Sequence, residues 1–164
     1  MFTEDELQQL LTCPKKVINP PLKKHRVTDR GYCENSFTVK AEGTGIEYLV
    51  FIKQNSRFPE NFSVGLLFNP PDQKGLITLV RCNGKHGGTI STPHHAHFHI
   101  HKATAEALNK GMLESGEIEI TDQYADLDNA IQCFVKMINL DAEDRSKFFP
   151  PPIQPNSTQL DLGI

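Results

Sequence analysis

Residues 46–69, IEYLVFIKQNSRFPENFSVGLLFN, contain two β-rich segments, at 46–54 and 62–69. Valine, isoleucine, phenylalanine and tyrosine are enriched in strands, which predicts that both segments are extended. Turn signals rich in glycine, proline and asparagine occur between such segments, so successive strands are expected to be antiparallel neighbours in a meander. The other β-rich segments lie at 36–42, 76–82 and 94–101.

Helical patterns flank these strands. Thr3 and Glu6 have the capping-box spacing, which predicts a short helix over residues 3–12. Residues 102–112 predict a second helix. Residues 126–140 place their apolar side chains on one side at helical spacing, so a third helix is expected to cover the sheet.

Residues 116–121, GEIEIT, alternate in the manner of an edge strand. With this strand included, the expected fold class is α+β. The expected architecture is an antiparallel sheet of five to six strands, with two to three helices packed mainly on one face.

The 164-residue chain contains 38% hydrophobic and 23% charged residues, which fits one soluble domain. We expect this domain to span residues 1–147 and a proline-rich, extended or mobile tail to follow over 148–164. Residues 14–34 are expected to form an irregular arm. The formal net charge of −3 conceals a cluster of cations in this arm, which could meet phosphates or could simply face solvent.

No apolar run approaches the roughly 20 residues that span a bilayer, and the N-terminus is acidic and amphipathic, unlike a secretory signal. A cytoplasmic location without a membrane partner is therefore expected. The four cysteines are widely spaced and form no CxxC pair, so we expect reduced thiols. They are Cys13, Cys33, Cys82 and Cys133.

Residues 93–102, PHHAHFHIHK, contain five of the seven histidines. Because side chains alternate across a strand, four of them are expected in a column on one face, with the intervening apolar residues in the core. Neighbours in such a column lie ~6.6 Å apart and could share one zinc ion, whereas four imidazoles spread over about 20 Å could not. The four are His95, His97, His99 and His101.

The loop at 81–88, RCNGKHGG, adds a candidate third ligand, His86, to His99 and His101. A divalent metal such as zinc or manganese is the expected cofactor. His94 and His25 are weaker ligand candidates. The candidate substrate-binding residues are Arg81, Asn83 and Lys85, of which the two cations could hold an anion.

Both patterns are also compatible with purely structural roles. A hairpin turn accounts for the glycines of the loop equally well. Alternating histidines could also be the polar, half-exposed face of an antiparallel strand.

The segment His95-Ala96-His97-Phe98-His99-Ile100 resembles the strand of the histidine-triad nucleotide hydrolases and transferases, whose middle histidine attacks a phosphorus. The resemblance covers about eight residues. It implies that His97 is a nucleophile supported by His95 and His99, with Ser91 or Thr92 near the phosphate.

A broader resemblance, over about residues 45–140, is to an uncharacterised family of small bacterial proteins. Its members carry Arg-x-Asn-Gly-x-His and then His-x-His-x-Ala-Thr running into a helix. The resemblance implies no activity, but it favours His86, His99 and His101 over His95 and His97. The matching residues here are Arg81, Asn83, Gly84, His86, His99, His101, Ala103 and Thr104.

These patterns favour a metal-assisted or histidine-based hydrolase of a phosphate ester, either RNA or a nucleotide. His97, His99 and Glu106 are the candidate catalytic residues. The alternative is a non-catalytic binding module or regulator, for example of a bacterial toxin or defence system, with the histidines as a recognition or metal-sensing face. A protein partner and a homo-oligomer are compatible with either hypothesis.

Overall fold

A computed structural model describes residues 1–72, 75–114 and 116–153. Its strands form one antiparallel sheet in the order β1-β3-β4-β5-β6-β7-β8, and β2 pairs with β3 outside this path. The strands are β1 (Lys15–Asn19), β2 (Arg26–Val27), β3 (Tyr32–Ala41), β4 (Glu47–Asn55), β5 (Phe62–Phe68), β6 (Ile77–Asn83), β7 (His99–Ala103) and β8 (Gly116–Ile120).

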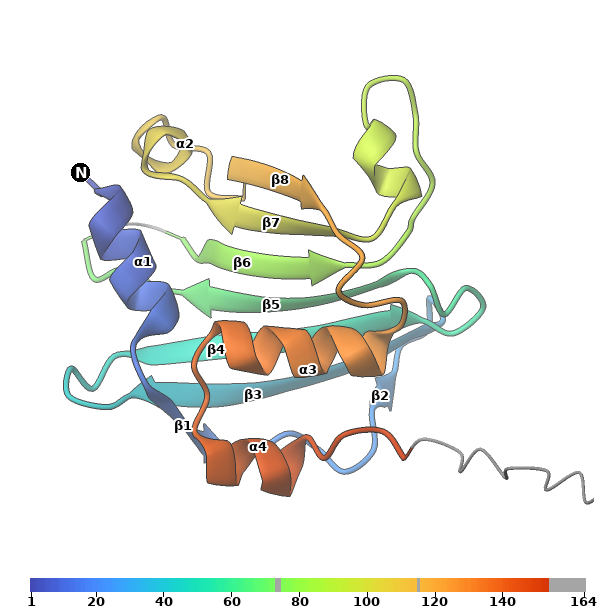
Figure 1. Cartoon of the computed structure of the whole chain (residues 1–164), viewed down its shortest axis with the longest axis horizontal. Helices are drawn as coiled ribbons and strands as arrows, with labels where there is room; N and C mark the ends of the chain where they lie inside the picture. The colour runs from blue at the N-terminus through green and yellow to red at the C-terminus, as the bar shows by residue number, and fades with distance from the viewer. Residues whose placement is uncertain (73–74, 115, 154–164) are drawn as a thin grey trace, which may run out of the picture.

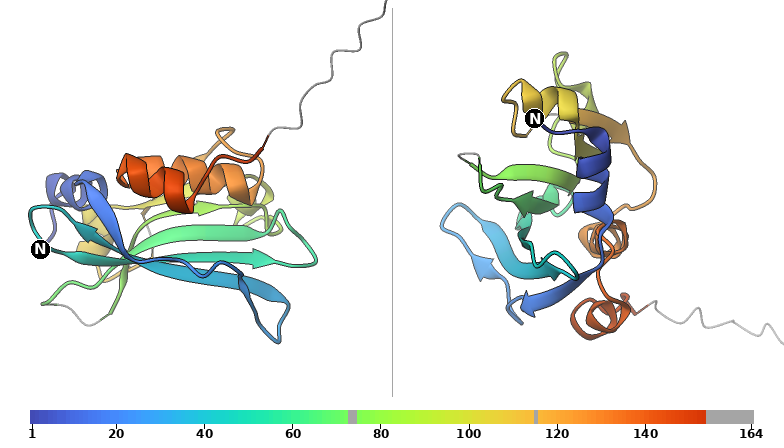
Figure 2. Two further views of the ribbon diagram at one scale, coloured as in Figure 1. Left: turned by 90° about the horizontal axis from the view of Figure 1, so that it is seen from below. Right: turned by 90° about the vertical axis from the view of Figure 1, so that its left-hand side faces the viewer.

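Three helices lie on one face of this sheet (Figures 1 and 2). They are α1 (Glu4–Thr12), α3 (Leu127–Met137) and α4 (Ala142–Phe148). The short helix α2 (Ala105–Asn109) follows β7, and a 3-10 turn, η1 (Pro93–Ala96), precedes it. In the described part of the chain, no α-helix covers the opposite face, which we call the open face.

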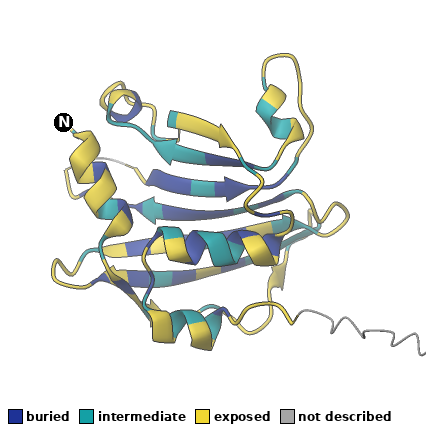
Figure 3. Cartoon of the chain, viewed as in Figure 1, coloured by how far each residue is buried: buried dark blue, intermediate teal, exposed yellow. Residues whose placement is uncertain are grey.

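The core lies between the sheet and these helices. Strand β4 is extended as predicted, and Tyr48, Val50 and Ile52 are buried toward the helices. Helix α3 presents Phe134 to the same core, where it is fully buried. The central strands are buried along most of their length, whereas the edge strand β8 is largely exposed (Figure 3).

The α+β class, the antiparallel strand order and the helices on one face confirm the prediction, but the number of strands was wrong. The sheet has eight strands rather than five to six, and two of them, β1 and β2, lie in the arm at 14–34 that was expected to be irregular. Prolines and lysines make this part of the sequence unlike a typical strand. They are tolerated here because β1 is a short strand at the edge of the sheet, beside β3.

Lys15 of this arm is fully buried rather than solvated. Its Nζ donates to the carbonyl oxygens of Leu11, Cys13 and Ile138 at 2.7, 2.9 and 3.1 Å, at the ends of α1 and α3. The ammonium also lies 5.0 Å from the ring centroid of Tyr48. The free carbonyls of two helix ends thus stabilise a buried cation.

The C-terminal segment also differs from its prediction. Helix α4 was not expected, and it extends to Phe148, inside the predicted tail. Phe149 is buried, and its ring centroid lies 5.0 Å from that of Phe37 in β3. The rest of the predicted tail, at 154–164, lies outside the described residues.

All four cysteines are free thiols. None of the helices in the described ranges combines the length and the apolar character needed to cross a bilayer.

Candidate metal centre

The predicted histidine strand begins later than expected. Pro93 opens the 3-10 turn η1, and β7 starts only at His99. Within the preceding loop, Thr89 and Thr92 exchange backbone hydrogen bonds, and the amide of His86 donates to the carbonyl of His95 at 2.9 Å. The loop therefore folds back on itself and places His86 beside His95.

The prediction of a column of four alternating histidines is therefore wrong. His99 and His101 do alternate with the buried Ile100 on β7, but His95 reaches the same region through the turn rather than through strand geometry. His97 is exposed and lies outside both candidate metal groups.

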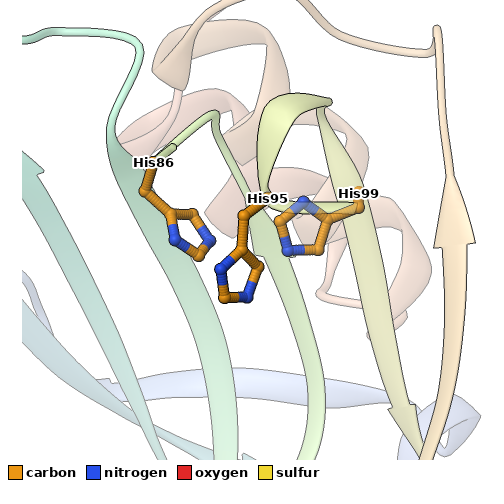
Figure 4. A group of neighbouring side chains, drawn as sticks. All are labelled: His86, His95 and His99. Atoms are coloured by element: carbon orange, nitrogen blue, oxygen red, sulfur yellow. The ribbon is translucent and has the colours of Figure 1, made fainter. Parts of the chain in front are cut away.

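Five imidazoles converge next to the start of β7 and form two groups that could each hold a metal ion. Within each group, the potential ligand atoms all lie within 4.8 Å of one another. Figure 4 shows one group, with a ring from the loop, one from η1 and one from β7 gathered around a common space. The groups are His86–His95–His99 and His94–His99–His101.

His99 belongs to both groups, is fully buried, and has its two ring nitrogens in different environments. Its Nδ1 lies 2.8 Å from the carbonyl oxygen of His97, to which it donates in the neutral tautomer that this contact favours. That tautomer makes Nε2 the acceptor of the ring, so a metal would bind there in place of the contact from the Asn83 amide. The side-chain amide of Asn83 lies 3.4 Å from Nε2, and the hydroxyl of Ser63 fixes it by donating to Oδ1 at 2.7 Å.

The shared nitrogen limits the metal stoichiometry. One imidazole lone pair binds one metal ion, and the Nδ1 of His99 is already engaged by the backbone. The two groups could therefore not both be filled at once, and together they could hold one ion.

The environment of these rings favours their neutral, metal-binding form. Burial, with the nearby charges of Arg81 and neighbouring histidines, lowers the pKa of His86 and of His101 to about 4. The same causes lower the pKa of His95 and His99, although the hydrogen bond from His99 to the His97 carbonyl opposes the shift. Neutral imidazoles at pH 7 meet the first requirement for binding a metal.

Arg81 lies beside this cluster, since it pairs with His101 across β6 and β7. Burial lowers the pKa of its guanidinium, and its Nε is buried without a hydrogen-bond partner. Among the described residues, its side chain forms no hydrogen bond or ion pair. A guanidinium with unused donors can bind a phosphate oxygen.

The remaining predicted residues differ in position. Asn83 contacts His99, whereas the ammonium of Lys85 lies 3.7 Å from a Glu60 carboxylate oxygen and over the ring of Phe98. Glu106 is exposed in α2, beyond the opposite end of β7, where it pairs with Lys110 (Figure 1).

Sequence reasoning undervalued His94 and His95, which complete the two groups. The available signal was Pro93, because proline favours the first position of a turn and makes a continuous strand from residue 94 less favourable. His25, the other weaker candidate, is exposed in the arm and belongs to neither group.

Comparison with known proteins gave no match to a protein-family model, a curated protein or a solved structure.

Proposed function

We propose that this protein is a metal-assisted hydrolase of phosphate esters, with a zinc or manganese ion held by His99 and two other histidines. The donor set carries the proposal: each group offers three imidazoles and leaves a fourth tetrahedral position for water or substrate. Structural zinc sites usually have four protein ligands, whereas catalytic zinc sites have three.

A bound ion would supply a Lewis acid that polarises a phosphoryl oxygen and activates water. Arg81 would hold the negative charge of the phosphate, because it lies beside His101 in the register of β6 and β7 and its side chain forms no ion pair with the described residues. The clustered histidines that do not bind the ion would lie close enough to move a proton as general base and acid. If no metal binds, the same imidazoles support acid–base hydrolysis alone. The catalytic roles of His97 and Glu106 remain predictions, without a side-chain contact to the cluster.

Elemental analysis and a hydrolysis assay test this proposal on tag-free protein purified without a nickel column or chelator. The substrates are 4-nitrophenyl phosphate and bis(4-nitrophenyl) phosphate, with added zinc or manganese. Arg81→Gln should keep the metal but lower kcat/KM by roughly 100-fold, the usual effect of losing one transition-state hydrogen-bond donor. Lys102→Gln is the control, since Lys102 lies on the opposite face of β7 and pairs with Glu119.

Hydrolysis that is absent from the wild type, or unchanged in Arg81→Gln, would contradict the proposal. Stoichiometric metal without hydrolysis of either ester would instead support the metal-sensing regulator.

A further inference from the structure

The open face extends from β7, which carries His99 and His101, across β6 and β5 to β4. Figure 2 shows this side of the sheet turned away from the helices. Phe51 of β4, Gly65 of β5, Arg81 of β6 and His101 of β7 are successive partners in register, so they form one row on this face. The adjacent row contains Lys53, Ser63, Asn83 and His99. Side chains of both rows therefore lead directly to the candidate metal centre.

Between the two ends of these rows, strand β5 presents little side-chain volume on the open face, and we call this area the floor. It contributes only Ser63, whose hydroxyl is bound to Asn83, and Gly65, which has no side chain. A Cβ atom at Gly65 would collide with the ring of Phe51. The half-buried aromatic ring thus lies against the backbone of β5, one strand away from Arg81.

Cations border the floor on the side away from the metal centre. Lys53 and Arg26 both pair with one carboxylate, that of Glu34, at 3.7 and 3.3 Å. Two cations sharing one acid leave a net positive charge, and their side chains are 47% and 74% exposed. Both of these side chains and Phe51 line one cavity of about 380 Å³.

The dimensions favour a ligand longer than one nucleotide. Adjacent strands lie about 4.8 Å apart, so roughly 10 Å separates the backbones at Phe51 and Arg81, and roughly 14 Å separates β4 from β7. Arg81 is at the metal centre, the aromatic ring is in the middle, and Lys53 and Arg26 are beyond it. Cations that follow a phosphate backbone, combined with an aromatic ring that stacks on a base, are the usual means of binding a single strand.

We propose that the open face binds a short single-stranded nucleic acid. The phosphate to be cleaved lies at Arg81 and the histidines, an adjacent base stacks on Phe51, and Lys53 and Arg26 meet the backbone beyond it. This inference rests on the proposed function for the location of the cleaved phosphate, and it names the substrate class.

Fluorescence anisotropy of the full chain tests binding separately from hydrolysis. The probe is a fluorescein-labelled six-nucleotide uridine RNA, with EDTA present so that no metal-dependent cleavage occurs. A thymidine DNA of equal length, an RNA duplex and uridine monophosphate are the comparison ligands. Single strands should bind more tightly than the duplex and the mononucleotide, and the RNA and DNA arms show whether the 2′-hydroxyl is read.

Phe51→Leu keeps an apolar side chain against Gly65 but removes the stacking surface. It should weaken single-strand binding by roughly 5- to 150-fold, the usual range for one stacked base. Leu49→Ala is the matched control, because Leu49 is 38% exposed on the same strand and face, one row further along. Lys53→Gln should lower the slope of log affinity against log salt by about 0.7.

The inference is overturned if the wild type binds no single strand, if Phe51→Leu and Leu49→Ala behave alike, or if the duplex binds equally well. Thermal melting confirms that each variant is folded. Failure of this inference leaves hydrolysis of the nitrophenyl esters intact, whereas tight single-strand binding without ester hydrolysis overturns only the proposed function.

Discussion

Replacing His99 should abolish metal binding, whereas replacing any one of the other four clustered histidines should not. His99 is the member common to both ligand groups, and its Nε2 is the one nitrogen left free of the backbone. Without His86, the group His94–His99–His101 remains complete, and without His101 the other group remains complete. Without His99, each group falls to two imidazoles.

The size of the expected loss in zinc affinity follows from the number of ligands. Four-ligand zinc sites have apparent binding free energies of about 10–16 kcal/mol, so one ligand contributes on the order of 3 kcal/mol. Loss of the third imidazole should therefore weaken zinc binding by roughly 100-fold. Loss of His86 or His101 alone should cost much less, because the ion moves to the other complete group.

Zinc titration against a chromogenic chelator measures both affinity and stoichiometry. Wild type, His86→Ala and His101→Ala should each bind one equivalent, and His99→Leu should bind none at micromolar zinc. Because His99 is fully buried, a second variant guards against misfolding. The double variant His86→Ala/His101→Ala keeps His99, removes one ligand from each group, and should also lose the metal. Two bound equivalents in the wild type, or loss of binding in a single variant at His86, would refute the reasoning.

Three further predictions concern stability. The pKa of His101 is about 4 in the folded protein and ~6.5 in the unfolded chain, so the metal-free protein should lose stability as pH falls from 6.5 to 4. Urea unfolding should show that the free energy of unfolding falls less over this pH range in His101→Gln than in the wild type. Lys15→Met leaves three buried carbonyls without their cation and should cost on the order of 3 kcal/mol in the free energy of unfolding, whereas equal stability would contradict the role assigned to Lys15. The hydroxyl of Tyr124 bridges the carbonyls of Asn83 and His99 at 3.1 and 2.8 Å. Tyr124→Phe should therefore lower the free energy of unfolding by roughly 1 kcal/mol and weaken zinc binding, as measured by urea unfolding and zinc titration.

Regular hydrophobic patterns made most of the fold predictable. Thr3 and Glu6 form the expected capping box, and α3 buries apolar side chains that were expected to cover the sheet, Phe134 and Val135 among them. Strands β1 and β2 were missed because both are short and lie against β3, where pairing partners decide what local composition cannot. The burial of Lys15 also depends on carbonyls from residues far apart in the sequence.

The candidate site was predictable as a set of residue types but not as a geometry. His99 and His101 follow strand alternation, and Arg81 follows from pairing on the neighbouring strand. His94 and His95 enter the site only because the loop closes on itself, which depends on backbone hydrogen bonds between Thr89 and Thr92. Alternation is a property of strands, so it could not predict a convergence made by a turn.

The same loop allows a test in which no ligand is replaced. Gly88 packs against the 3-10 turn, where an added Cβ would lie 2.9 Å from the Cβ and 3.1 Å from the amide nitrogen of Ala96. Gly88→Val should push η1 away from β7 and withdraw His94 and His95, so that each group loses one member and zinc binding weakens by roughly 100-fold. Ile90→Ala, at the fully exposed tip of the loop, should bind zinc like the wild type. Unchanged zinc affinity in Gly88→Val would mean that His94 and His95 do not depend on this packing, and the turn would then have no part in assembling the centre.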